Sequence, residues 1–185
     1  MAARVLCLII FILEVKGLSI SLPRRKWAAL AFYTQLSNIV TVISALLLVV
    51  FGQRLWITNI RYLSTCMLVM TLLITVCVLI PMGGDPKRLL WSGNGLYHHI
   101  LCPVISTISY VFFENHAGQK MIWFPILITL LYGLVMLYLN AKNKYDGPYP
   151  FFRVHHQTRR ATVLWIVVLL LIIAVISAVV MAVAR

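Results

Sequence analysis

The chain has 185 residues, of which 62% are hydrophobic and only 11% are charged, and this composition excludes an ordinary soluble domain. Sixteen lysines and arginines against four acidic residues give a formal net charge of +12. In a membrane protein such basic residues gather in cytoplasmic loops beside anionic headgroups, so the charge does not indicate binding to nucleic acid. We therefore expect one domain, residues 1–185, folded as an all-α polytopic transmembrane helical bundle.

Six apolar stretches are long enough, at about 1.5 Å of helix per residue, to cross a hydrocarbon core roughly 30 Å thick. Short polar or basic loops separate them, and the expected spans are residues 2–22, 27–52, 62–82, 91–113, 121–140 and 161–184. The first stretch is not expected to be a signal peptide, because no small-residue cleavage pattern follows its apolar core. Basic residues favour the loops after the first, third and fifth spans, which predicts that these loops are cytoplasmic.

Polar side chains recur at spacings of three and four residues through the second expected span, so they share one helix face. They are Thr34, Ser37, Asn38, Thr41 and Ser44. Two interpretations of this stripe stay open. The side chains either hydrogen-bond to neighbouring helices, at about 1 kcal/mol each, or line an intramembrane cavity in which one hydroxyl performs chemistry.

Ionisable side chains also fall within the expected spans, with Glu14 in the first and the pair His98 and His99 in the fourth. An acid in lipid faces the bundle interior or pairs with a base, so Glu14 is either a structural carboxyl or a catalytic group. Adjacent helical positions point about 100° apart, so at most one histidine faces a given cavity squarely, and a shared metal ion is not expected. That histidine is either a hydrogen-bond partner for another helix or a general base. Pro103 is expected to kink the helix at His99.

Thr34 and His99 each lie about eight residues into spans that start from the same side, which predicts a depth of roughly 12 Å for both. A hydroxyl and an imidazole at one depth suit a nucleophile and its base. Ser37 and Asn38 lie one turn further along and are the expected hydrogen-bond donors to a developing oxyanion.

The loop before the last span combines turn-forming and aromatic residues, a composition typical of an ordered cap at the membrane interface. It carries Lys144, Tyr149, Phe151 and Arg153. Tyr149 and Phe151 are expected to cover the cavity and contact a substrate. Arg153 or Lys144 is expected to bind a free carboxylate on that substrate.

Three motifs carry a resemblance: FYTQLSN in the second span, LYHHILCP in the fourth and GPYPFF before the last. In this order and in a six-span chain they resemble the androgen-induced-gene family of membrane proteins and its bacterial relatives. The resemblance implies an intramembrane threonine hydrolase, here in a bacterial cell membrane, that cleaves fatty acid esters of hydroxy fatty acids without a cofactor or metal. Carried over to this chain, its catalytic residues are Thr34 and His99.

The resemblance leaves open which group orients the imidazole of His99. Ser109 stands where relatives often have an acid, and Glu14 is then the candidate by default. A second hypothesis is a non-catalytic lipid- or solute-binding protein, or a small transporter, in which the stripe and His99 form a binding cavity or proton path. The absence of strong internal repeats and of a second buried acid counts against transport. A structural assembly factor is a third hypothesis. The lipid substrate and the membrane are the expected partners.

Overall fold

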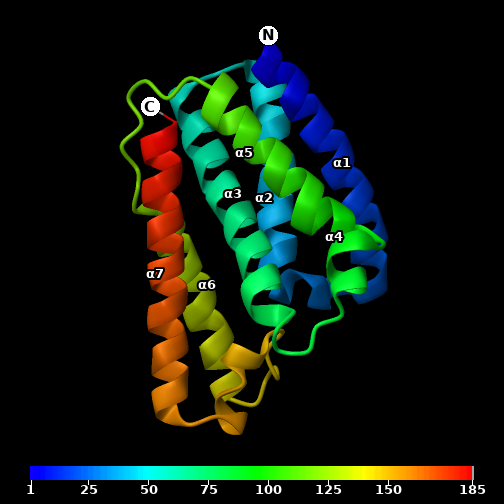
Figure 1. Cartoon of the computed structure of the whole chain (residues 1–185), viewed down its shortest axis with the longest axis vertical. Helices are drawn as coiled ribbons and strands as arrows, with labels where there is room; N and C mark the ends of the chain where they lie inside the picture. Colours follow the sequence, from blue (N-terminus) through cyan, green and yellow to red (C-terminus); the bar gives the residue numbers. More distant parts are fainter. Residues whose placement is uncertain (185) are drawn as a thin grey trace.

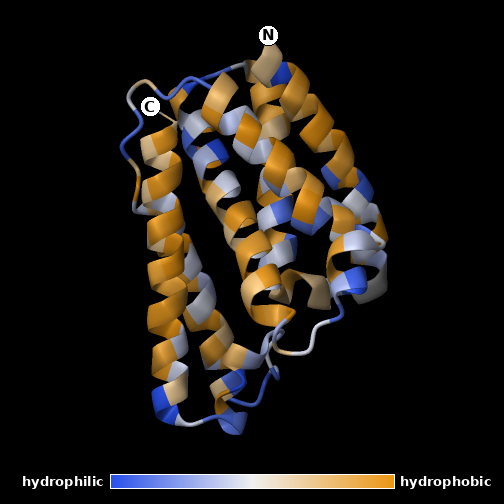
Figure 2. Cartoon of the chain, in the orientation of Figure 1, coloured by the Kyte–Doolittle hydropathy of each residue, from blue (hydrophilic) through white to orange (hydrophobic). Residues whose placement is uncertain are grey.

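The computed structural model describes residues 1–184, except for the side chains of residues 24 and 25. Over that range the protein is all-α, as predicted, and six of its helices are long and apolar enough to cross a membrane. The protein is therefore an integral, multi-pass membrane protein. Figure 2 shows hydrophobic residues along all the long helices, with hydrophilic residues gathered in the loops and at a few places inside the bundle.

The helices are α1 (Ala2–Arg25), α2 (Tyr33–Phe51), α3 (Leu55–Ile74), α4 (Asn94–Leu96), α5 (Cys102–Phe113), α6 (Phe124–Ala141) and α7 (Arg159–Val183). Two π-helical turns extend the membrane spans: Thr75–Leu79 continues α3, and Tyr97–Leu101 joins α4 to α5. A further π turn, Lys87–Trp91, precedes α4. A π turn directly before Pro103 takes the place of the simple kink predicted at His99, since the wider turn accommodates the missing backbone N–H.

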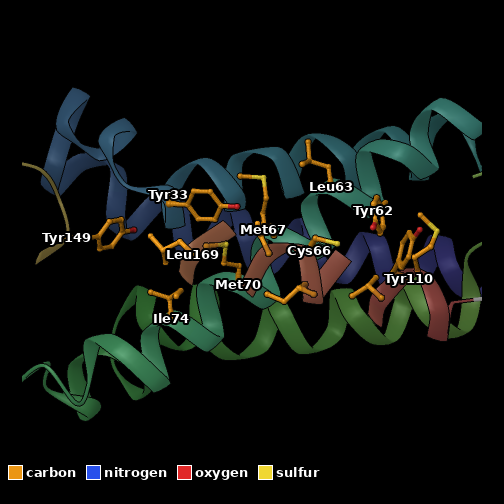
Figure 3. Close-up of a cluster of buried hydrophobic side chains, with 14 of the residues drawn as sticks. Tyr33, Tyr62, Leu63, Cys66, Met67, Met70, Ile74, Tyr110, Tyr149 and Leu169 are labelled. Carbon is orange, nitrogen blue, oxygen red and sulfur yellow. The ribbon is translucent and has the colours of Figure 1, made fainter. Parts of the chain in front are cut away.

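Helix α3 is the centre of the bundle and packs against α2, α5, α6 and α7. In Figure 1, α1, α2, α3 and α5 form one group, and α6 and α7 form a pair along the other side of α3. A hydrophobic core follows α3 between these groups. Figure 3 shows this core running from Tyr149 and Tyr33 at one end to Tyr62 and Tyr110 at the other.

The second span begins later than predicted, which changes the expected depth of Thr34. The prediction counted residues from 27 as α-helix, but Lys26 has a φ of 50° and Lys26–Ala31 forms a 3-10 helix. Helix α2 starts only at Tyr33, so Thr34 lies in its first turn. The depth of roughly 12 Å, obtained by counting helical rise, is therefore wrong.

The third span begins earlier than predicted and carries a charge into the bundle. Arg61, expected in the polar loop before this span, lies within α3 and is completely buried. Its Nε and Nη2 donate to the carboxylate of Glu114, at 3.1 and 3.0 Å from Oε1, and Nη2 also donates to Ser106 Oγ at 3.1 Å. Ser109 Oγ donates to Glu114 Oε1 at 2.9 Å. Glu114 is thus a second buried acid besides Glu14, whereas the sequence had indicated only one.

Candidate active site

Thr34 lies where α2 begins, and its backbone and side chain both face Tyr149. The Thr34 N–H donates to the Tyr149 hydroxyl at 3.4 Å, and Thr34 Oγ1 is 3.3 Å from the same oxygen. An N–H in the first turn of a helix has no carbonyl four residues back, so the phenol supplies its missing acceptor. The hydroxyl of Thr34 is part-buried, with the positive end of the helix dipole beside it.

His99 lies in the π turn Tyr97–Leu101, and its partner lies in the π turn that continues α3. His99 Nδ1 is 2.9 Å from Thr75 Oγ1, and the Thr75 hydroxyl donates its own proton to Thr71 O at 2.8 Å. Because that proton is engaged, the hydroxyl accepts from His99, and Nδ1 carries the ring proton. Nε2 then has a lone pair, as a general base requires.

The structure brings Thr34 and His99 to the wall of one cavity of about 830 Å³, which Gln35 and Tyr149 also line. This cavity lies at the end of the bundle where the first, third and fifth loops meet. No hydrogen bond joins Thr34 to His99 directly within the described part of the chain. The two side chains therefore share a cavity without contacting each other.

A second, smaller cavity of about 60 Å³ also has Thr34 on its wall. Its walls come from α3, α6, α7 and the loop before α7, and most of the lining side chains are apolar, including Ile74, Leu134 and Phe151. Leu134 is exposed on the outer surface of α6, which in a membrane faces lipid. Thr34 and Tyr149 therefore line both a large cavity with mixed polar and apolar walls and a small, mostly apolar one.

Ser37 and Asn38, the predicted oxyanion donors, are buried and turned toward their own helix. Ser37 Oγ donates to Thr34 O at 2.9 Å, and Asn38 Nδ2 donates to the same carbonyl. Neither residue lines either cavity. In this conformation both side chains donate to the Thr34 carbonyl, and the hydroxyl of Tyr149 lies beside Thr34 Oγ1.

Glu14 and His98 form a separate buried pair. His98 Nε2 lies 3.9 Å from Glu14 Oε2, while His98 Nδ1 lies 3.5 Å from Gln35 Nε2. Gly17 makes this contact possible, because a Cβ there would lie 2.4 Å from His98 Nε2. The two histidines turn to different partners, as predicted. Glu14 faces His98 and not His99, so the default expectation that it orients the catalytic imidazole is not supported.

Thr75 holds His99 instead, and sequence reasoning missed it. A signal was present, since Thr71 and Thr75 repeat at a four-residue spacing inside an apolar stretch. Ser109, at the position where the sequence resemblance leads us to expect an acid, bonds to Glu114 and belongs to the other end of the bundle.

The loop before α7 contributes aromatic residues to the site but not the expected cations. Tyr149 and Phe151 are buried and stacked at a ring distance of 5.1 Å, with Phe151 on the wall of the small cavity. Arg153 and Lys144 are exposed and line neither cavity, and Arg153 lies 3.7 Å from Asp146. Neither Arg153 nor Lys144 is therefore placed to bind a carboxylate inside either cavity. The arginine that lines the large cavity is Arg88.

Comparison with known proteins adds no relative. No protein-family model matches the chain, and no curated protein or solved structure matches it significantly. The fold defines a six-span α-helical membrane protein.

Proposed function

We propose that this protein is an intramembrane hydrolase that cleaves lipid carboxylic esters, with Thr34 as the nucleophile and His99 as its general base. The observation that carries the proposal is the position of Thr34 at the junction of the two cavities, with His99 on the wall of the larger one. An ester placed at this junction would have its polar part in the large cavity and the first carbons of its acyl chain at the small apolar one. The three motifs add the substrate class, fatty acid esters of hydroxy fatty acids, and a bacterial cell membrane.

In the proposed reaction, Thr34 Oγ1 attacks the ester carbonyl carbon while its proton moves to His99 Nε2. The resulting imidazolium gives that proton to the departing alkoxide, which leaves an acyl ester on Thr34. Water, activated by His99 in the same way, then releases the fatty acid and restores the hydroxyl. The contact between nucleophile and base forms when substrate is bound, as is common in sites that are loose without a ligand.

In the proposed reaction, the hydroxyl groups of Thr75 and Tyr149 assist the base and the nucleophile. Thr75 Oγ1 accepts a hydrogen bond from the Nδ1–H of His99, which keeps the lone pair of the ring on Nε2. Tyr149 accepts from the Thr34 N–H and places its own hydroxyl 3.3 Å from Oγ1, beside the position where negative charge develops. Charge at this point also lies at the positive end of α2.

The second candidate is a lipid- or solute-binding protein without turnover, or a small transporter. The buried Glu14 and His98 pair favours it, because ionisable groups inside a membrane protein commonly belong to a solute or proton path. A fluorophosphonate probe that reacts with activated serine and threonine hydroxyls separates the two candidates. Labelling of purified protein at Thr34, lost in Thr34→Ala, supports hydrolysis, whereas unlabelled protein that still binds lipid supports the second candidate.

A further inference from the structure

The large cavity has one fixed charge on its wall. Among the described residues that line it, Arg88 is the sole lysine, arginine, aspartate or glutamate. The other lining residues are polar, apolar or glycine, apart from His99. A cation without an acid beside it on a cavity wall attracts an anionic group.

Arg88 is not neutralised by the chain itself. The four acidic side chains have other neighbours: Glu14 faces His98, Glu114 bonds to Arg61, Asp146 lies near Arg153, and Asp85 accepts the N–H of Lys87. No ion pair joins Arg88 to any of these four carboxylates. Its guanidinium is therefore available to a ligand.

The backbone of the turn that carries Arg88 packs closely against the span that carries His99. The π turn Lys87–Trp91 lies directly against Gly95, where an added Cβ would be 2.5 Å from Leu89 O and 2.8 Å from Arg88 O. Only a residue without a side chain allows this approach. Gly95 stands one helical turn before His99 on the same span, so the turn with Arg88 and the imidazole belong to one packed unit.

We propose that Arg88 determines specificity by binding the free carboxylate of the substrate's hydroxy-acid part inside the large cavity. This proposal rests on the proposed function. The carboxylate lies in the large cavity, the ester at Thr34, and the first carbons of the acyl chain reach the small cavity among Ile74, Leu134 and Phe151. An arginine suits this role because its planar donors match both oxygens of a carboxylate. Triglycerides and simple alkyl esters lack that group and are poorer substrates.

The kinetic test compares one branched lipid ester as its free acid and as its methyl ester. The wild-type protein is expected to prefer the free acid, and Arg88→Ala to lower the ratio of the two kcat/KM values by about tenfold to a hundredfold. Arg88→Lys, which keeps the charge but not the planar fork, is expected to lie between them. Lys87→Ala is the matched control, because Lys87 is the adjacent exposed cation and does not line the cavity. It should leave the ratio unchanged.

Two kinetic results overturn the proposal: an unchanged ratio in Arg88→Ala, or an equal fall in Lys87→Ala. A phosphate-bearing lipid forms the third arm, since arginine also binds phosphate. If a long-chain alkyl phosphate inhibits hydrolysis in an Arg88-dependent manner more strongly than the corresponding fatty acid does, the carboxylate assignment is overturned in favour of a phosphate. Arg88 is exposed, so its variants should keep the wild-type melting temperature in detergent.

A binding measurement separates failure of this proposal from failure of the proposed function. In a Thr34→Ala background, the affinities of a fluorescent fatty acid and of its methyl ester are compared with and without Arg88→Ala. If Arg88→Ala removes the preference for the acid, the role of Arg88 is supported. This holds even if no form of the protein hydrolyses an ester, a result that would overturn only the proposal that the protein is a hydrolase. Normal hydrolysis together with equal affinities for acid and methyl ester overturns the role of Arg88 alone.

Discussion

At one end of the bundle the side chains of Arg61 and Glu114 are completely buried and bonded to each other, whereas at the other end Thr34 and His99 line a large cavity. Hydroxyl side chains contact these residues at both ends: Ser109 bonds to Glu114, and Thr75 bonds to His99. At the first end Glu114 accepts from Arg61 and Ser109, and neither Arg61 nor Glu114 lines the cavities described above. At the second end, His99 Nε2 has a lone pair to use. A polar residue in lipid is structural when a partner neutralises its charge and no cavity reaches it, and available for chemistry when a cavity reaches a group with a lone pair to use.

The first prediction concerns the nucleophile and carries the largest effect. Thr34→Ala is expected to lower ester hydrolysis by more than about a thousandfold and to abolish labelling by the fluorophosphonate probe. The free energy of unfolding should change by less than about 1 kcal/mol, because the lost contact to Tyr149 is long and part-buried. Thr34→Ser keeps a hydroxyl and should retain part of the activity. Hydrolysis by Thr34→Ala at the wild-type rate would remove the nucleophile assignment.

The second prediction concerns Arg61 and Glu114 at the opposite end, where a substitution should lower the free energy of unfolding without changing the rate of hydrolysis. Glu114→Ala leaves Arg61 buried without its carboxylate, which is expected to cost about 3–5 kcal/mol in the free energy of unfolding. The activity of the fraction that remains folded should stay near wild type. Replacing both partners, as Arg61→Met with Glu114→Leu, should recover most of the lost stability. If the double variant is as unstable as Glu114→Ala, the pair contributes to stability by more than mutual neutralisation of its two charges.

The contrast between the two ends also shows what the sequence could predict. Length and hydropathy were sufficient for six helices, because a span needs only enough consecutive apolar residues. The same criterion placed Arg61 outside the membrane, since a charge normally ends an apolar stretch. Its partner Glu114 stands 53 residues away, so the ion pair that makes burial of Arg61 tolerable depends on how α3 and α5 pack.

Within the candidate site, residue identity was easier to predict than orientation. Thr34 and His99 do line one cavity, although the equal-depth argument for it was wrong, because Lys26 interrupts the helix before α2. Thr75 and Arg88 were missed as site residues. Which side chain faces which cavity depends on the rotation of each helix and on close packing such as that at Gly95, and neither can be obtained from one sequence.

The third prediction separates the adjacent histidines at the cavity end. His99→Ala is expected to lower the hydrolysis rate by about a hundredfold or more, as the loss of a general base commonly does. His98→Ala should have a smaller effect on the rate of folded protein, because His98 contacts Gln35 and Glu14 and does not line the cavity. Rates are normalised to folded protein by size-exclusion chromatography in detergent. The opposite ranking would move the base to His98.

The last prediction, with the smallest effect, asks whether Thr75 positions the imidazole or only packs beside it. Thr75→Val keeps the volume but removes the acceptor for His99 Nδ1, so the ring is no longer held with its lone pair on Nε2. We expect hydrolysis to fall about tenfold, with KM nearly unchanged, and Thr75→Ser to restore most of the rate, because a hydroxyl returns. Thr65→Val is the matched control from the opposite end, since it removes a buried hydroxyl of α3 that contacts Ser106 and not the site. Both valine variants should lose a similar free energy of unfolding, about 1 kcal/mol, but only Thr75→Val should slow hydrolysis. Equal rates in the two valine variants would make Thr75 a packing residue and leave the imidazole oriented by another group.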